Sequence, residues 1–308
     1  MRKVITSYIN PDLDGISLMY AYAEFLRKKG EDAEYYCEGT PRKEVGIVLD
    51  MFGIELNSIA DIEADDKIIL VDTNSFPEIS EKVTKDNVVE IIDHHQRQDW
   101  LDGRNIKVQI DLIGAAATIV AERFKKENIS ISRESAILLY YGIISNTMNL
   151  KIKLTNQRDI EMAKWLRSLV PELTDEITKE IFVKKSDIGD RLREEMEIEL
   201  KDSFMSISWS MGQLEVANLP EFLAKYESKI RAIMDTVSKE NDVEYVAVNC
   251  MDIINGYSII LARDERTAKI ITEAINNINF DGLSAKTTTL VSRKELVKVL
   301  REVYKKEN

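Results

Sequence analysis

The hydrophobic pattern of the first half of the chain alternates short apolar runs with longer amphipathic segments. The runs at 4–9, 67–72 and 88–92 are rich in β-branched residues and bounded by polar ones, which is typical of strands buried in a parallel sheet. Two shorter strands are expected at 33–37 and 106–110. Helical periodicity predicts a helix directly after the first strand, with the apolar stripe Ile16, Met19, Tyr20, Ala23 and Leu26, and further helices at 43–52, 114–126, 133–147, 155–169 and 174–184. This β-α-β alternation predicts a parallel sheet with right-handed crossovers.

The pattern changes after the polar cluster KKSDIG at 184–189, where we place a domain boundary. The predicted domains are 1–188 and 189–308. In the second one, Met205, Ile207, Trp209 and Met211 alternate with serines, which predicts a strand with one buried face. Asn255-Gly256 separates two apolar runs and indicates a hairpin. Helices are expected at 223–239, 266–278 and 293–305, giving a smaller α+β domain with a mixed sheet beside the α/β domain.

Composition narrows the class of protein. A hydrophobic content of 44% with 31% charged residues is that of a soluble globular protein. The net charge of −12 argues against extended contact with long nucleic acids, which calls for clustered Lys and Arg. Cys37 and Cys250 are far apart and indicate neither a disulfide framework nor a thiolate metal site. Since no signal peptide or membrane-spanning run is evident, we expect a cytoplasmic protein without membrane contact.

Acidic and imidazole side chains stand where three predicted strands end. Asp12 and Asp14 follow the first strand, Asp72 ends the second, and His94 follows the third. Ligands of open α/β sheets bind at the carboxyl ends of the strands, so these side chains are expected in one cleft. Such a mixed oxygen and nitrogen donor set suits Mn²⁺, Mg²⁺ or Co²⁺. Taken singly, each aspartate could equally be a helix cap or a turn residue, and the adjacent histidines a surface pair.

The motifs resemble those of a known family, the DHH phosphoesterases, and within it the family II, manganese-dependent inorganic pyrophosphatases. NPDLD at 10–14, VD at 71–72, DHH at 93–95 and GIISNT at 142–147 resemble the four motifs of the metal-binding domain. Further resemblances along the chain are VKKSDI at 183–188, MDIIN at 251–255 and SRK at 292–294. The resemblance implies a DHH domain over 1–188, a C-terminal DHH-associated substrate-binding domain over 189–308, and an active site between them.

Two-metal hydrolysis of a phosphoanhydride, either pyrophosphate or short polyphosphate as in exopolyphosphatases, is the activity that this resemblance implies. It implies two ions, Mn²⁺ or else Mg²⁺ or Co²⁺, with Asp72 bridging them. The other roles it implies are one ion on Asp12, the other on Asp14 and His94, substrate contact by His95, orientation of the histidines by Asp93, and neutralisation of the leaving phosphate by Arg293 and Lys294.

Two positions differ from the pyrophosphatase pattern. Tyr8 stands where the first motif begins with a metal-binding histidine, and Asn146 where the fourth carries a metal-binding aspartate. A phenol with a pKa of about 10 is a poor donor at neutral pH, and an amide oxygen is weaker than a carboxylate. The alternative is therefore a degenerate relative that binds a phosphorylated ligand or nucleotide without turnover. An oligonucleotide phosphodiesterase is a third reading, which the acidic charge disfavours. The expected partner is a small phosphorylated substrate, and a homodimer stays open.

Overall fold

The computed structural model describes residues 1–56, 61–197, 208–275 and 277–304. By its internal contacts the chain divides into two compact units, Met1–Ile181 and Phe182–Asn308. This division falls ahead of the boundary expected after residue 188, and the assignment of functions to domains 1–188 and 189–308 stays a prediction.

A five-stranded parallel sheet forms the centre of the first unit, in the order β2-β1-β3-β4-β5. Its strands are β1 (Lys3–Thr6), β2 (Ala33–Tyr36), β3 (Lys67–Val71), β4 (Val88–Asp93) and β5 (Lys107–Ile110). All five were expected, and their parallel direction confirms the prediction. Because β1, β3 and β4 are neighbours, the three strand ends that carry the candidate ligands lie along one stretch of the sheet edge.

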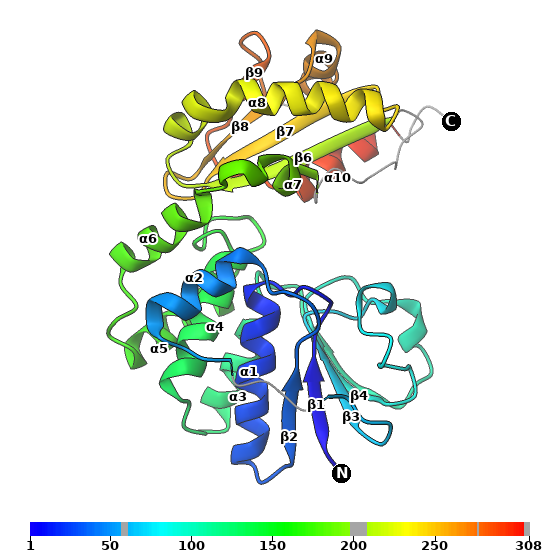
Figure 1. Cartoon of the computed structure of the whole chain (residues 1–308), viewed down its shortest axis with the longest axis vertical. Helices are drawn as coiled ribbons and strands as arrows, with labels where there is room; N and C mark the ends of the chain where they lie inside the picture. The colour runs from blue at the N-terminus through cyan, green and yellow to red at the C-terminus, as the bar shows by residue number, and fades with distance from the viewer. Residues whose placement is uncertain (57–60, 198–207, 276, 305–308) are drawn as a thin grey trace. The chain divides into compact units, whose positions relative to one another are not determined.

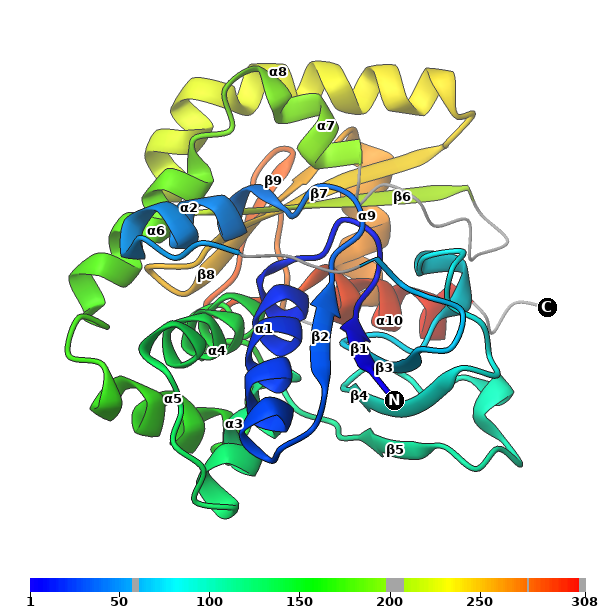
Figure 2. The ribbon, with the colours of Figure 1, turned by 60° about the horizontal axis from the view of Figure 1, so that its bottom comes forward.

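Helices cover one face of this sheet, where α1 packs against α3 and α4 in both views (Figures 1 and 2). The helices of this part of the chain are α1 (Leu13–Lys28), α2 (Lys43–Phe52), α3 (Ala117–Lys126), α4 (Arg133–Asn146) and α5 (Gln157–Leu169), followed by α6 (Asp175–Ser186), within which the first unit ends. The other face, with Val4, Ile68 and Leu70, is covered by residues of the connecting segments. These segments contain the short 3-10 turns η1 (Phe76–Glu78) and η2 (Asp99–Leu101), and their contributions include Ile79, Val83, Leu101, Phe76 and Trp100.

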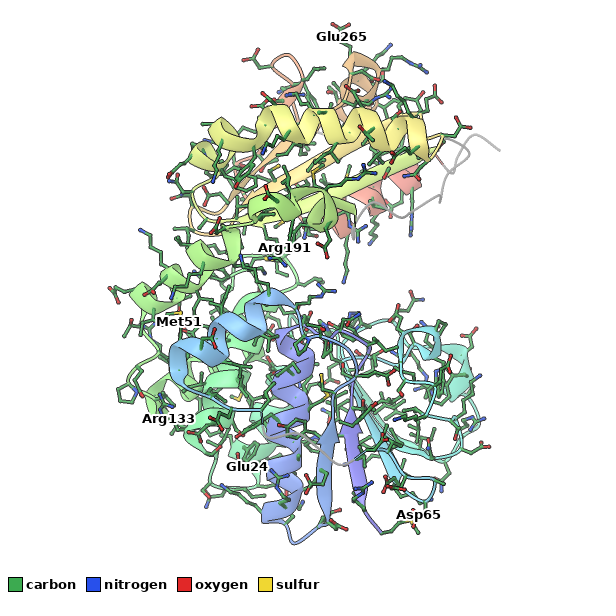
Figure 3. All side chains as sticks on the ribbon, viewed as in Figure 1. Glu24, Met51, Asp65, Arg133, Arg191 and Glu265 are labelled. Atoms are coloured by element: carbon green, nitrogen blue, oxygen red, sulfur yellow. The ribbon has the colours of Figure 1, made fainter. Side chains whose placement is uncertain are left out.

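A buried carboxylate joins α1 to the start of α4. Glu24 of α1, labelled in Figure 3, accepts hydrogen bonds from the amide and hydroxyl of Ser132 and from the hydroxyl of Ser135. Ser132 is also the N-cap of α4, since its hydroxyl oxygen accepts the Ser135 amide at 3.1 Å. One acidic side chain thus fixes where α4 begins relative to α1. The far end of α4 carries Asn146.

The second unit has a four-stranded mixed sheet in the order β6-β7-β8-β9, as the sequence predicted. The strands are β6 (Trp209–Val216), β7 (Tyr245–Asp252), β8 (Tyr257–Ala262) and β9 (Ser284–Lys286), of which only β6 and β7 pair in parallel. The helical segments are η3 (Gly189–Arg191), α7 (Leu192–Glu197), α8 (Leu219–Glu240), α9 (Glu265–Ala274) and α10 (Arg293–Tyr304). The hairpin at Asn255-Gly256 is confirmed, with Gly256 at φ 79°.

The expectation of a strand with one buried face is wrong for β6. Trp209 and Met211 pack in a core with residues of α9 and α10, whereas Leu214 and Val216 pack in a second core with residues of α7 and α8. Helices on both faces of the sheet therefore bury both sides of the strand, and Ser210 is buried as well. Met205 and Ile207 lie outside the residues that the structure describes. Over the described part of the chain, no helix is both long and apolar enough to cross a membrane.

Candidate metal centre

Asp72 occupies the first position after β3, in a backbone conformation that few aspartates adopt. Its φ is 56°, in the left-handed region, while its amide donates to the Ile92 carbonyl of β4 at 2.9 Å. A non-glycine residue in this region carries a backbone cost of order 1 kcal/mol, and such strain concentrates at functional sites. The turn directs a carboxylate that is only 2% exposed toward the end of β4.

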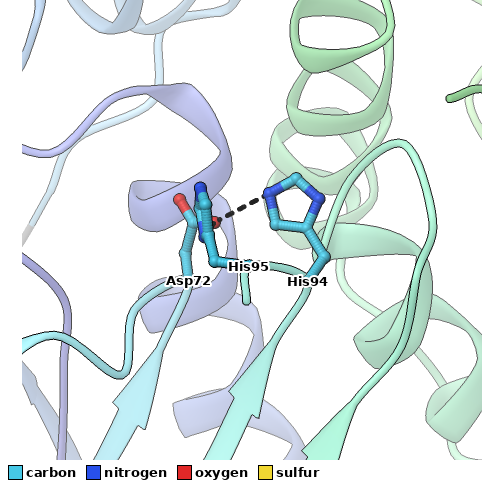
Figure 4. A group of neighbouring side chains, drawn as sticks. All are labelled: Asp72, His94 and His95. Atoms are coloured by element: carbon cyan, nitrogen blue, oxygen red, sulfur yellow. Dashed lines mark ion pairs between the residues drawn. The ribbon is translucent and has the colours of Figure 1, made fainter. Parts of the chain in front are cut away.

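Asp72, His94 and His95 together form a group that can hold a metal ion (Figure 4). One donor atom from each of the three side chains lies within 4.8 Å of the other two. Asp72 Oδ1 is 3.4 Å from His94 Nε2 and 3.8 Å from His95 Nδ1. The two imidazole rings meet edge to face, with centroids 4.4 Å apart.

The hydrogen bonds of His94 leave its second nitrogen available to an ion. Its Nδ1 lies 3.0 Å from the Ile113 carbonyl, which can only accept, so Nδ1 carries the proton. In the neutral ring, the Nε2 lone pair then faces the carboxylate oxygen of Asp72. That contact is repulsive unless a proton or a cation lies between the two atoms.

The electrostatics of this pair fit a cation. Burial lowers the pKa of His94, but the carboxylates of Asp72 and Asp14 outweigh it and raise that pKa to about 10. Burial and the neighbouring carboxylates also raise the pKa of Asp72 well above its usual range. Among the residues that the structure describes, none donates a hydrogen bond to the buried Asp72 Oδ1. Without an ion, this pKa keeps a proton on His94 Nε2, 3.4 Å from Asp72 Oδ1; a divalent metal that displaced the proton would have a carboxylate oxygen and an imidazole nitrogen as ligands.

Asp93 is completely buried and orients both histidines. Its Oδ1 accepts the amides of His94 and His95 at 2.7 and 3.1 Å and lies 2.8 Å from His95 Nδ1. Burial opposes its ionisation, but the hydrogen bonds from His95 and Asn74 hold the pKa of Asp93 below its usual range. Asp93 therefore supports the histidines instead of facing the group in Figure 4.

Asn74 is a supporting residue that the sequence analysis missed. Its amide nitrogen donates to Asp93 Oδ2, its side-chain oxygen accepts the Gln98 amide, and its backbone carbonyl accepts the Trp100 indole N–H at 2.7 Å. In the sequence, only its position two residues after Asp72 indicated that Asn74 could have a role at the site. Asn74 thus joins the end of β3 to the segment that follows the histidines.

Asp12 and Asp14 already serve as hydrogen-bond acceptors for backbone amides. Asp12 is the N-cap of α1, and its Oδ1 accepts the amides of Asp14 and Gly15 at 3.0 and 3.1 Å. Asp14 accepts the amides of Ala116 and Ala117, both at 2.8 Å, at the start of α3. Burial raises the pKa of Asp14 to about 7. Asp12 therefore has the helix-capping role that the sequence left open as an alternative. The carboxylates of Asp12 and Asp14 both retain lone pairs that an ion could use.

The two positions that differ from the pyrophosphatase pattern both lie beside these carboxylates. The Tyr8 hydroxyl accepts the Asp12 amide at 3.1 Å, and burial together with Asp12 and Asp72 raises the pKa of Tyr8 far above its usual value. It therefore stays a neutral phenol. Asn146 Nδ2 donates to Asp14 Oδ2 at 2.9 Å and lies 3.4 Å from His94 Nε2. Asn146 is thus part of the cluster, as a donor to it.

Arg293 and Lys294 are the first two residues of α10, in the second unit. The helix begins at Arg293, as expected, and Ser292 and Glu295 exchange hydrogen bonds across its first turn. The Arg293 amide donates to Gln213 Oε1 at 2.7 Å. The place of Arg293 and Lys294 opposite the metal group stays a prediction.

Comparisons with known proteins agree with this geometry. Residues 2–143 match the model of the DHH family N-terminal domain. The matched residues lie within the first unit. The chain is 28% identical to a probable manganese-dependent inorganic pyrophosphatase of Streptococcus thermophilus, over 96% of this chain and 97% of that protein. A protein of the same name from Streptococcus agalactiae is also 28% identical, over 99% of both chains.

A solved structure with the same fold exists. It is the crystal structure of a Methanococcus jannaschii protein assigned to the family II inorganic pyrophosphatases, and it matches the chain with a TM-score of 0.73 at 24% identity. The match covers 98% of this chain and 99% of the other. The resemblance to the DHH proteins and the predicted fold class are both confirmed.

Proposed function

We propose that this protein is a metal-dependent phosphoanhydride hydrolase whose substrate is pyrophosphate or a short polyphosphate. The observation that carries the proposal is the buried Asp72 Oδ1, which accepts no hydrogen bond from any residue that the structure describes and lies 3.4 Å from His94 Nε2. Relatives that match nearly the whole chain are named probable manganese-dependent inorganic pyrophosphatases, which supports Mn²⁺ as the ion and a phosphoanhydride as the substrate.

In this proposal Asp72 and His94 hold a divalent cation. A bound cation supplies Lewis acidity, lowering the pKa of a coordinated water and neutralising charge on a phosphoryl oxygen. The Ile113 carbonyl keeps His94 in the tautomer whose Nε2 can donate a lone pair. Asp93 holds His95, which is 44% exposed at its side chain and is therefore free to contact substrate phosphate.

Asp12 and Asp72 would hold a second cation, and Asp14 would join His94 and Asp72 at the first; this part of the proposal has less support. Tyr8 is a neutral hydrogen-bond acceptor for a backbone amide, and Asn146 directs an N–H group toward Asp14. Neither Tyr8 nor Asn146 adds a negative charge beside Asp12 or Asp14. Arg293 and Lys294 are proposed to neutralise the leaving phosphate, because paired cations suit that charge. A homodimer and a cytoplasmic location stay predictions.

The proposal is tested by phosphate release from pyrophosphate, tripolyphosphate and a dinucleotide with Mn²⁺, Mg²⁺ or Co²⁺. A Tyr8→His, Asn146→Asp double variant is assayed beside the wild type. Wild-type turnover of pyrophosphate or tripolyphosphate supports the proposal, and turnover of the dinucleotide alone redirects it to phosphodiester hydrolysis. If only the double variant turns over, the wild type is a binding protein built on a hydrolase site. If both are inactive, the proposal is wrong.

A further inference from the structure

The segment between β5 and α3 contacts two of the candidate ligands through its backbone. The Ile113 carbonyl lies 3.0 Å from His94 Nδ1, and the amides of Ala116 and Ala117 each lie 2.8 Å from an oxygen of Asp14. These are backbone atoms, so their positions depend on the path of the segment and not on its side chains. Any shift of residues 113–117 moves the supports of both ligands at once.

Asp159, in the first turn of α5, holds this segment at two points. Its Oδ2 accepts the Gly114 amide at 2.9 Å, and its Oδ1 accepts the Thr118 hydroxyl at 2.6 Å. The side chain is completely buried. Gly114 follows Ile113 directly and Thr118 follows Ala117 directly, so the two hydrogen bonds flank the backbone groups that contact His94 and Asp14.

The space around Gly114 indicates that the segment has little freedom to move. A Cβ atom at this position would lie 2.5 Å from Thr147 Cγ2 and 2.9 Å from Asp159 Oδ2, and both distances are below normal contact. Thr147 follows Asn146 and is itself buried. Gly114 is therefore packed between the end of α4 and the carboxylate of Asp159, and only the absence of a side chain permits that approach.

We propose that Asp159 is a positioning residue for the cation centre, which it stabilises through the 113–118 segment without touching the ion. The inference rests on the proposed function, since it assumes that His94 and Asp14 serve a cation. The alternative is a purely local role, because Asp159 also accepts the Asn156 amide at 2.9 Å in a capping box at the start of α5. A local role affects stability alone, whereas a positioning role also affects metal affinity.

The test compares Mn²⁺ dissociation constants, measured from the electron paramagnetic resonance signal of free Mn²⁺, with urea midpoints of the metal-free protein. Asp159→Ala removes the contact, and Asp159→Asn preserves its shape, since the amide oxygen can accept the Gly114 amide while the amide nitrogen donates to Thr118. Gly114→Ala disturbs the same contact from the other side. Leu166→Ala is the control, because Leu166 is buried on the same helix but has no hydrogen bond to the segment.

Asp159→Ala and Gly114→Ala are expected to weaken Mn²⁺ binding by about tenfold or more, the usual effect of losing a residue that orients a metal ligand. Asp159→Asn is expected to stay within about threefold of wild type, and Leu166→Ala to lower the urea midpoint without changing affinity. Unchanged affinity in a folded Asp159→Ala protein overturns the proposal, as does an equal loss in Leu166→Ala. If Asp159→Ala does not fold, Gly114→Ala decides by the same criterion.

The outcome also separates this inference from the proposed function. A wild type that binds Mn²⁺ and loses affinity in the Asp159→Ala variant, but releases no phosphate from any substrate, retains the inference and overturns the hydrolase proposal. A wild type that hydrolyses pyrophosphate, together with an Asp159→Ala variant that keeps its Mn²⁺ affinity, supports the hydrolase proposal and overturns the inference. A wild type that binds no Mn²⁺ overturns the inference.

Discussion

Replacing Asn146 by aspartate is expected to destabilise the metal-free protein and to make it more dependent on Mn²⁺. Asn146 Nδ2 now donates to Asp14 Oδ2 at 2.9 Å. The substitution removes this hydrogen bond to a charged group, worth about 1.5 to 3 kcal/mol. It also places two carboxylates in contact.

The size of the destabilisation follows from the 2.9 Å between the side chains of residues 146 and 14. Two unit charges at that separation repel by about 6 kcal/mol at an effective dielectric constant of about 20, and protonation of one of them limits the cost. At pH 8 Asp14 is ionised, because its pKa of about 7 lies below that pH. We therefore expect Asn146→Asp to lower the free energy of unfolding by about 3 kcal/mol or more in the presence of a chelator.

The sign of the pH dependence can be checked in the same experiment. The repulsion needs an ionised Asp14, so the penalty is present above pH 7 and decreases as the pH falls through the Asp14 pKa. Mn²⁺ at 100 times its dissociation constant should restore about 2.7 kcal/mol, because the ion binds only the folded state. Asn146→Ala, which loses the hydrogen bond without gaining a charge, is the control.

Urea unfolding at pH 8 and pH 5.5, with chelator and with Mn²⁺, measures all of these differences. The reasoning is refuted if Asn146→Asp without metal is within about 1 kcal/mol of wild type at pH 8, or if it is no less stable than Asn146→Ala.

Three further predictions concern the supports of the site and the fold. Asn74→Ala should lower the free energy of unfolding by about 1 to 3 kcal/mol in chemical denaturation, because it leaves the buried Asp93 Oδ2 without a donor; no change would show that water replaces it. Burial raises the pKa of Glu24, but Lys28 and the serine hydroxyls outweigh it and bring that pKa below its ordinary 4.5. The stability from Glu24 is therefore present above pH 4.5 and lost as the pH falls through the folded-state value, so the difference between wild type and Glu24→Gln should shrink in acid-titrated urea melts; a constant difference contradicts this. Gly256→Ala, at φ 79°, should cost about 1 kcal/mol and lower the thermal midpoint, and an unchanged midpoint would mean that the turn adopts another conformation.

The sequence alone determined the sheet of the first unit and the place of the candidate site. Apolar runs at the period of buried strands, separated by amphipathic helices, require a parallel sheet, and parallel strands present their carboxyl ends at one edge. Asp12, Asp72 and His94 follow three such runs. These three side chains come together because the strands are parallel neighbours, and the local hydrophobic pattern is sufficient to predict those strands.

Tertiary structure alone decided which lone pairs of these side chains remain for an ion. The amides that bind Asp14, the carbonyl that fixes His94, and Asp159 behind them come from segments far away in the chain. The periodicity of a sequence predicts which face of a helix or strand is buried, but not which atoms of remote segments its side chains contact. The same reason explains β6, where α7 and α8 cover the face that its alternating serines had indicated to be exposed. Contacts between remote segments depend on packing, and packing is settled only when the whole unit folds.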